Sequence, residues 1–347
     1  MIPTPIAAAL SPRYAIRREL GRGGMARVYL ADDVRHGRQV AIKTMLPEVS
    51  AAIGRDRFLR EIETAARLTH PNILPLFDSG EAEGHLWYVT PFIEGESLRQ
   101  RLTRDGPLSV PDAVRVIRGV AAALDHAHRQ GVVHRDIKPE NILVADGIAL
   151  VADFGIARAM VADADSETSA TRDVGLTGSG MTVGTPRYMA PEQFGRADVD
   201  GRADLYAMGC VLFEMLTGEP PFDGTTLADL MRAHLAEAPR SIAESRPEAG
   251  GNLSEAVRRL LAKQADERPA TGAAFLVLLD GARLPAAMSA LPNNLPRERT
   301  SFVGREKDVA TAGRLLDEAR LLTITGIGGC GKTRLALRLA RERLGAF

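Results

Sequence analysis

The sequence predicts an α+β protein in which a β-rich lobe precedes an α-helical lobe, with a short α/β segment after them. Short runs of β-branched and aromatic residues, separated by turn residues, fill most of positions 13–92 and are typical of strands. Beyond Gly95 the apolar residues recur at helical spacing. Near the C-terminus a helical run, a short apolar run and a glycine-rich turn follow one another.

Length and composition indicate an ordinary globular protein of about two domains. The chain has 347 residues, and 45% of them are apolar. Its 44 basic and 44 acidic residues cancel, so charge gives no reason to expect nucleic acid or an acidic membrane as a partner. Cys210 and Cys330 suit a reducing compartment, and no apolar run is long enough for a membrane span. We therefore expect a cytoplasmic protein.

The first lobe is expected over residues 13–94, after an N-terminal tail over 1–12. Strands are predicted in "RVYLADD", "QVAIKTM" and "LWYVTPF", and one helix in "RDRFLREIETAARL". The turn "LGRGGMARVYL" is rich in glycine, and a plain hairpin explains that as well as a phosphate-binding loop does. Lys43 lies on the strand "VAIK" and, taken alone, is most simply a solvated lysine.

The second lobe is expected over residues 95–283. The run "LSVPDAVRVIRGVAAALDHAHRQG" predicts a helix that Ser109 and Asp112 cap and Gly131 ends. The run "ADLYAMGCVLFEMLTG" is apolar on nearly all sides, which favours a buried helix. A surface loop is expected over 161–183 and a proline-containing linker over 284–300.

The second lobe also contains "HRDIKPEN", "DFG" and "GTPRYMAPE", in that order. Together with the glycine-rich turn and "VAIK", these motifs resemble those of the eukaryotic-like Ser/Thr protein kinases of bacteria in type, order and spacing. The resemblance covers about Tyr14–Asp280. It implies a two-lobed protein-kinase fold, with ATP and Mg²⁺ as cofactors and Mn²⁺ as the alternative ion.

The resemblance also implies which residues bind ATP. Phosphoryl transfer depends on positioning and charge neutralisation, which backbone amides over the phosphates and a lysine beside them supply. Lys43 would be held by Glu61, while Ala41 and Leu143 would enclose the adenine. Thr90 aligns with the gatekeeper position. The third glycine of the loop is replaced by Ala26, a change that related kinases tolerate. The implied ATP contacts are Leu20, Gly21, Arg22, Gly23, Gly24, Met25, Ala26, Arg27, Val28, Ala41, Lys43, Thr90 and Leu143.

The catalytic residues are implied in the same way. Asp136 would orient the acceptor hydroxyl and take its proton, and Lys138 would steady the transferred phosphate. Asn141 and Asp153 would hold Mg²⁺, a hard ion that prefers oxygen ligands. A single aspartate in a loop is more often a turn residue or a cap. Here, however, Asp136, Asn141 and Asp153 occur together at the spacing of the family.

The acceptor class and its control follow from further matches. The motif "DIKPEN", with Lys138, is similar to that of Ser/Thr kinases rather than tyrosine kinases. Thr185 in "GTPRY" matches the residue that bridges to Asp136 and Lys138 in that class. Arg135 accompanies control by phosphorylation of the activation loop, where a phosphate gains charge-assisted hydrogen bonds. We expect the kinase to phosphorylate itself in trans. The candidate phosphosites are Thr177, Ser179 and Thr182.

Three residues are expected to support the site without taking part in the chemistry. Glu192 of "APE" and Arg268 of "DERPA" are predicted to form a structural ion pair. Asp204 of "ADLY" is predicted to brace the backbone of the catalytic loop.

The stretch "GIGGCGKT" fits a second nucleotide motif, formed by Gly326, Gly331, Lys332 and Thr333. It follows a predicted strand, "LLTIT", precedes a helical run, and resembles the start of signal-transducing P-loop NTPases. Residues 301–347 offer no second strand and no acidic Walker B residue, so we expect an incomplete domain that hydrolyses no nucleotide by itself.

The predicted function is a Ser/Thr protein kinase in bacterial signalling, with protein substrates, no nucleic-acid partner and no membrane. Two alternatives stay open at the level of sequence. One is an ATP-binding regulatory module that controls a C-terminal NTPase. The other is a small-molecule phosphotransferase, which shares the Asp/Asn loop; "APE" and the long segment before it favour a protein acceptor.

Overall fold

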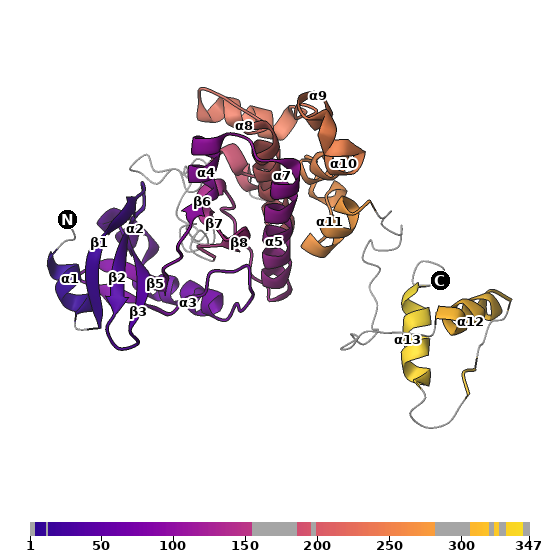
Figure 1. Ribbon diagram of the computed structural model, residues 1–347, viewed down its shortest axis with the longest axis horizontal. Helices are drawn as coiled ribbons and strands as arrows, with labels where there is room; N and C mark the ends of the chain where they lie inside the picture. The colour runs from indigo at the N-terminus through magenta and orange to yellow at the C-terminus, as the bar shows by residue number, and fades with distance from the viewer. Residues whose placement is uncertain are drawn as a thin grey trace, which may run out of the picture. The chain divides into compact units, whose positions relative to one another are not determined.

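The computed structural model describes residues 4–11, 13–154, 186–195, 199–281, 306–318, 323–325 and 331–342. The chain divides into two compact units, Met1–Ala282 and Arg283–Phe347. In the first unit a β-rich lobe precedes a helical lobe (Figure 1), as the sequence predicts.

An antiparallel five-stranded sheet forms the first lobe, in the order β1-β2-β3-β5-β4. Its strands are β1 Tyr14–Arg22, β2 Ala26–Asp33, β3 Arg38–Met45, β4 Asp78–Ala82 and β5 His85–Pro91. Two helices, α2 Pro47–Ile53 and α3 Arg55–Ala66, follow β3. Phe58 and Ile62 of α3 pack with Met45, Leu86 and Tyr88 in one buried cluster. The predicted helix at α3 is confirmed, whereas α2 was not predicted.

The structure corrects the expected tail over residues 1–12. Helix α1, Thr4–Leu10, occupies this segment, and Ile6 and Leu10 are 0% and 4% exposed. They lie one helical turn apart on the same face and pack against Tyr14, among other apolar residues of the sheet. The gain from burying these two side chains explains a helix that is too short to persist alone.

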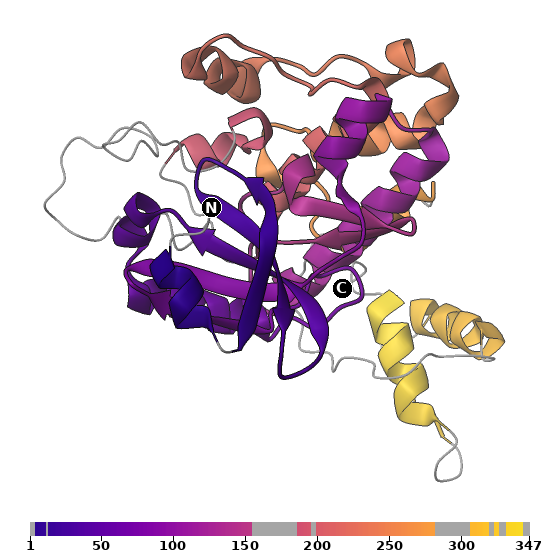
Figure 2. The ribbon, with the colours of Figure 1, turned by 60° about the vertical axis from the view of Figure 1, so that its left-hand side comes forward.

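The helical lobe is built around α5 and α7, which contact each other (Figures 1 and 2). Its elements are β6 Glu96–Ser97, α4 Leu98–Asp105, α5 Val110–Arg129, β7 Ile142–Ala145, β8 Ile148–Val151, α7 Gly201–Thr217, α8 Leu227–Ala236, α9 Ile242–Ser245, α10 Gly250–Leu260 and α11 Gly272–Leu279. Ser109 caps α5 by accepting a hydrogen bond from the backbone N–H of Asp112, as predicted.

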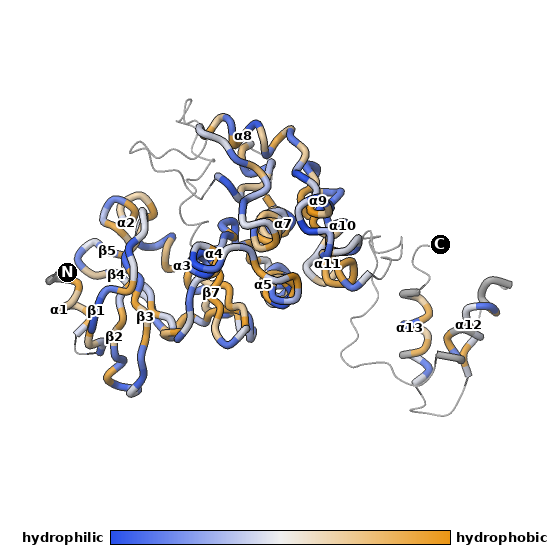
Figure 3. Tube along the Cα trace, turned by 45° about the horizontal axis from the view of Figure 1, so that its top comes forward, coloured by the Kyte–Doolittle hydropathy of each residue, from blue (hydrophilic) through white to orange (hydrophobic). Residues whose placement is uncertain are grey.

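Helix α7 is the buried helix that its composition predicts. Every residue from Ala203 to Leu216 is buried, and Figure 3 shows apolar positions along the helix. Cys210, at its centre, has no exposed surface, and burial raises the pKa of its thiol. The short sheet β6-β7-β8 lies on this lobe and holds the loops that carry the catalytic motifs.

The described residues of the second unit form two helices, α12 Glu306–Glu318 and α13 Lys332–Glu342. They pack through Val309, Ala312, Leu335 and Leu339, with Ile324 beside them. Both helices are predicted by the sequence, but the predicted strand over 321–325 is not formed at residues 323–325. A strand needs a neighbour for its backbone groups, and the described residues of this unit provide none. In the described residues no helix combines the length and hydrophobicity needed to cross a membrane.

Candidate active site

Several predicted ATP contacts are direct neighbours across strands β2, β3 and β5. Lys43 on β3 is the Cα partner of Val28 on β2 and of Tyr88 on β5. Ala41 is the partner of Thr90. Because side chains two residues apart share a face of a strand, Ala41 and Lys43 lie on the same face of the sheet.

The glycine-rich turn joins β1 to β2, with the backbone N–H of Gly23 donating to the carbonyl of Ala26 at 2.9 Å. A Cβ added at Gly21 or Gly24 would meet no atom within 4 Å. Packing inside the protein therefore does not require glycine here, whereas close approach of a ligand to the backbone would. The side chain of Ala26 is 5% exposed and packs in the cluster with Met45, which explains why a methyl group is tolerated at this position.

The catalytic loop gathers three of the predicted residues. Lys138 Nζ donates to Asp136 Oδ2 at 2.6 Å. Asn141 Nδ2 donates to the same oxygen at 3.1 Å and to the backbone carbonyl of Asp136 at 2.8 Å. The carboxylate of Asp136 is thus held in one orientation by a cation and an amide.

Asp153 lies next to this loop. The backbone N–H of Ala152 donates to the carbonyl of Asn141 at 2.9 Å, which ties the end of β8 to the loop that precedes β7. Asp153 has a φ of 68°, in the left-handed region that aspartate tolerates better than most residues. This turn brings together the two predicted metal ligands, Asn141 and Asp153.

The structure corrects the predicted partner of Lys43. Lys43 Nζ donates to Asp153 Oδ2 at 2.5 Å, and the described residues show no ion pair between Lys43 and Glu61. Glu61 lies on α3, as predicted, and has an interaction of its own. Asp153 is the closer anion because the β8 turn brings its side chain, which is 19% exposed, directly to the lysine.

Tyr88 is a site residue that sequence reasoning missed. Its hydroxyl donates to Asp153 Oδ1 at 2.5 Å. Burial alone would raise the pKa of Asp153, but the charge of Lys43 and the hydrogen bonds from Lys43 and Tyr88 outweigh burial and hold this pKa below its ordinary value. The carboxylate is therefore anionic at neutral pH. The sequence could have indicated Tyr88, because side chains two residues apart on a strand share a face and Thr90 was a predicted ATP contact.

Asp204 braces the catalytic loop as predicted. Its carboxylate accepts hydrogen bonds from the backbone N–H groups of His134 and Arg135 at 2.8 and 2.7 Å, and lies 2.8 Å from His128 Nε2. Arg135 has a φ of 67°, a conformation that costs about 1–3 kcal/mol outside glycine. The hydrogen bonds to Asp204 hold this strained backbone in place.

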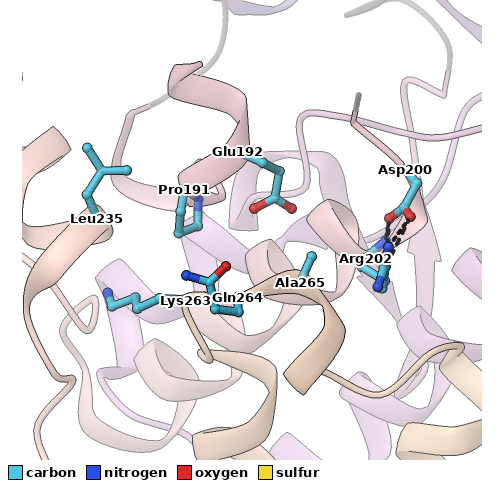
Figure 4. Close-up of a pocket in the computed structure, with 8 residues that line it drawn as sticks. All are labelled: Pro191, Glu192, Asp200, Arg202, Leu235, Lys263, Gln264 and Ala265. Atoms are coloured by element: carbon cyan, nitrogen blue, oxygen red, sulfur yellow. Dashed lines mark hydrogen bonds and ion pairs between the residues drawn. The ribbon is translucent and has the colours of Figure 1, made fainter. Parts of the chain in front are cut away.

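The predicted ion pair between Glu192 and Arg268 is also formed. Next to it lies a pocket of about 310 Å³ (Figure 4), lined by Pro191, Glu192, Asp200, Arg202, Leu235, Lys263, Gln264 and Ala265. None of the residues predicted to bind ATP or metal lines this pocket, and its acidic side chains are paired with arginines. We therefore assign the chemistry to the cluster around Asp153.

Some predicted residues lie outside the described residues: Thr177, Ser179, Thr182, Thr185 and Gly326. Of the other predicted ATP contacts, residues 20–22 end β1, residues 23–25 form the turn and residues 26–28 begin β2. Leu143 lies on β7.

Comparison with known proteins settles the family. Residues 14–275 match the family model described as the protein kinase domain. This chain belongs to the protein kinase family. The kinase is 40% identical over 320 residues to the serine/threonine-protein kinase PknD of Mycobacterium tuberculosis, covering 92% of this chain and 46% of that protein. It is 44% identical over 260 residues to PknE of the same species, covering 74% of this chain and 44% of that protein.

Solved structures agree with the two-lobed architecture. The kinase domain of PknI from Mycobacterium tuberculosis gives a TM-score of 0.61 at 30% identity, over 78% of this chain and 97% of that one. A structure of Rad53 in complex with AMP-PNP gives 0.61 at 24% identity and supports the fold alone. The kinase spans about half the length of the curated relatives it matches. These findings support a Ser/Thr protein kinase over a purely regulatory ATP-binding module.

Proposed function

We propose that this kinase transfers the γ-phosphate of ATP to Ser and Thr hydroxyls of proteins, with Mg²⁺ as the metal. The observation that carries the proposal is the meeting of Lys43, Asp136, Asn141 and Asp153, which come from both lobes, in one connected set of contacts. These groups are the ones that phosphoryl transfer requires.

The residues present fit a hard divalent cation. Asn141 uses its amide nitrogen on Asp136, which leaves its amide oxygen as a ligand. Asp153 supplies an anionic carboxylate, and oxygen ligands of this kind suit Mg²⁺. The bound ion would neutralise charge on the phosphates.

The protein side chains would then position the acceptor. The Asp136 carboxylate, fixed by Lys138 and Asn141, would accept a hydrogen bond from the incoming Ser or Thr hydroxyl and take its proton. Lys138, beside it, would steady the transferred phosphate, and Lys43 would neutralise phosphate charge from the sheet side.

The test is the variant Asp136→Asn. We expect turnover to fall by about 10²–10⁴-fold, the usual contribution of a positioned general base, while nucleotide binding persists. The matched control is Asp146→Asn, an exposed aspartate in the turn between β7 and β8, whose positive φ asparagine also accepts. Near-normal phosphate transfer by Asp136→Asn would refute the assignment.

We propose further that the second unit is the start of a P-loop NTPase domain. Gly331 has a φ of 81° and directly precedes α13, so Lys332 and Thr333 lie in the first turn of a helix, as phosphate-binding loops require. We expect no hydrolysis at this motif by itself. ATPase turnover that survives Asp136→Asn but is lost in Lys332→Ala would contradict that expectation. Bacterial signalling, a cytoplasmic location and the lack of a nucleic-acid or membrane partner stay predictions.

A further inference from the structure

Tyr88 occupies an unusual place for a polar group. It lies on β5, between Lys43 on β3 and Ser79 on β4, and is 2% exposed. Its ring belongs to the apolar cluster that also contains Phe58 and Ile62 of α3. A buried tyrosine hydroxyl normally needs a hydrogen-bond partner, and here the partner is the Asp153 carboxylate.

The two oxygens of Asp153 are held by neighbouring side chains of the same sheet. Lys43 contacts Oδ2 and Tyr88 contacts Oδ1, each at 2.5 Å. Lys43 and Tyr88 are cross-strand partners, and the ammonium lies 5.8 Å from the centre of the tyrosine ring. The sheet of the first lobe therefore fixes the orientation of a carboxylate that belongs to the helical lobe.

The two contacts differ in how firmly they hold. Lys43 has a flexible stem, is 26% exposed and is also the residue that would neutralise the ATP phosphates. The Tyr88 ring is buried in the cluster that contains Met45 of β3 and Phe58 and Ile62 of α3. When Lys43 engages phosphate, Tyr88 is the contact that still fixes the carboxylate. Because a carboxylate has about four acceptor positions, the hydroxyl and a cation can bind Asp153 together.

We propose that Tyr88 is a positioning residue for Asp153, which orients this carboxylate toward the divalent cation. The proposal rests on the proposed function, in which Asp153 binds the metal. Groups that orient a metal ligand typically change metal affinity or activity by about 10–100-fold when they are removed. Phenylalanine would fill the same volume and keep the packing, but it would leave Asp153 Oδ1 without this donor.

The test compares Tyr88→Phe with Tyr14→Phe. Tyr14 is also a buried tyrosine of the same sheet whose hydroxyl donates to an aspartate, Asp78, at 2.9 Å, but it does not contact the Asp153 cluster. With phosphate transfer as the readout, we expect Tyr88→Phe to raise the Mg²⁺ concentration for half-maximal rate about tenfold. The rate at saturating Mg²⁺ should change much less, and Tyr14→Phe should follow the parent protein.

A binding measurement without turnover supplies the second readout. ADP affinity is measured in EDTA and then over a Mg²⁺ titration. We expect Tyr88→Phe to bind ADP in EDTA as the parent does, and to need about tenfold more Mg²⁺ for the same gain in affinity.

Three outcomes would overturn the proposal: coinciding Mg²⁺ curves for Tyr88→Phe and the parent, an equal shift in Tyr14→Phe, or loss of ADP binding in EDTA. Failure of the proposed function would look different, because the parent protein itself would then show neither phosphate transfer nor a Mg²⁺ effect on ADP binding.

Discussion

Arg268 binds Glu192 with two parallel hydrogen bonds, Nη1 to Oε1 at 2.6 Å and Nη2 to Oε2 at 2.8 Å. The arginine side chain has no exposed surface and also donates to the backbone carbonyls of Arg202, Ala262 and Lys263. One side chain thus joins the start of α7, the segment before α11 and the segment that follows the activation loop.

Removing this arginine should be costly. We expect Arg268→Met to lower the free energy of unfolding by about 3–5 kcal/mol, because Glu192 and three carbonyls would lose a buried partner. Arg258→Met is the control, since Arg258 is 68% exposed and its pair with Glu255 should contribute less than about 1 kcal/mol. The free energy of unfolding of both variants is measured by urea titration, with circular dichroism as the signal. Equal losses in the two variants would show that the buried ion pair contributes no more to stability than the exposed one.

Two glycines at helix starts should respond to alanine in opposite directions. At Gly272, the first residue of α11, an added Cβ would lie 2.3 Å from the carbonyl oxygen of Ala121 on α5, so we expect Gly272→Ala to destabilise the protein by about 1–3 kcal/mol. At Gly251 in α10 a Cβ would meet nothing within 4 Å, and Gly251→Ala should stabilise by about 0.4–1 kcal/mol. Thermal unfolding distinguishes the two. A stable Gly272→Ala would mean that α11 shifts freely against α5.

His234 should make the helical lobe sensitive to acid. The side chain is fully buried, and burial, together with the charge of Lys263, lowers the pKa of His234 to about 4. The unfolded chain binds this proton near pH 6.5, so the stabilisation is complete above that pH and is lost as the pH falls toward 4. Between pH 7 and pH 5 the loss from this group should be about 2 kcal/mol.

The variant His234→Asn isolates this contribution. It should be less stable than the parent at pH 7, yet lose about 2 kcal/mol less between pH 7 and pH 5, because asparagine does not titrate. Unfolding in urea at both pH values gives the difference. Parallel losses in the two proteins would assign the acid sensitivity to other groups.

Phosphorylation of the activation loop remains a prediction from sequence. After incubation with Mg²⁺ and ATP, mass spectrometry should find phosphate between Ser166 and Thr182, with Thr177, Ser179 and Thr182 as the candidates. Asp136→Asn, which should not modify itself, should acquire phosphate there when mixed with the parent kinase. Full activity of a protein that carries no phosphate in this segment would exclude control by the loop.

Local patterns predicted most of the elements that position the site. Helix α5 follows from its cap at Ser109 and its apolar period, and α7 follows from its continuous apolar run. Helix α1 could not be predicted in this way, because its stability comes from Ile6 and Leu10 packing against strands that lie later in the chain. At residues 323–325 the predicted strand is not formed, because the described residues of the second unit offer no strand to pair with it.

Within the site, residues on one short loop were predictable and contacts between lobes were not. Asp136, Lys138 and Asn141 are close in sequence, so their spacing nearly determines their geometry. Asp153 contacts Lys43 and Tyr88, which are 110 and 65 residues away in the sequence. These contacts depend on the register of β3 against β5 and on the turn after β8. That register is not visible in a sequence, and so Glu61 was expected in place of Asp153, and Tyr88 was missed.

The thiol of Cys210 at the centre of α7 has a practical use. Since the reactive thiolate is scarce at a raised pKa and no surface of the residue is exposed, an alkylating reagent reaches it only when the helical lobe opens. In a protein with Cys330 replaced by serine, the alkylation rate would report how often this lobe opens under native conditions. Cys210 is thus a built-in probe of rare unfolding events. Ligands that rigidify the kinase should slow its alkylation.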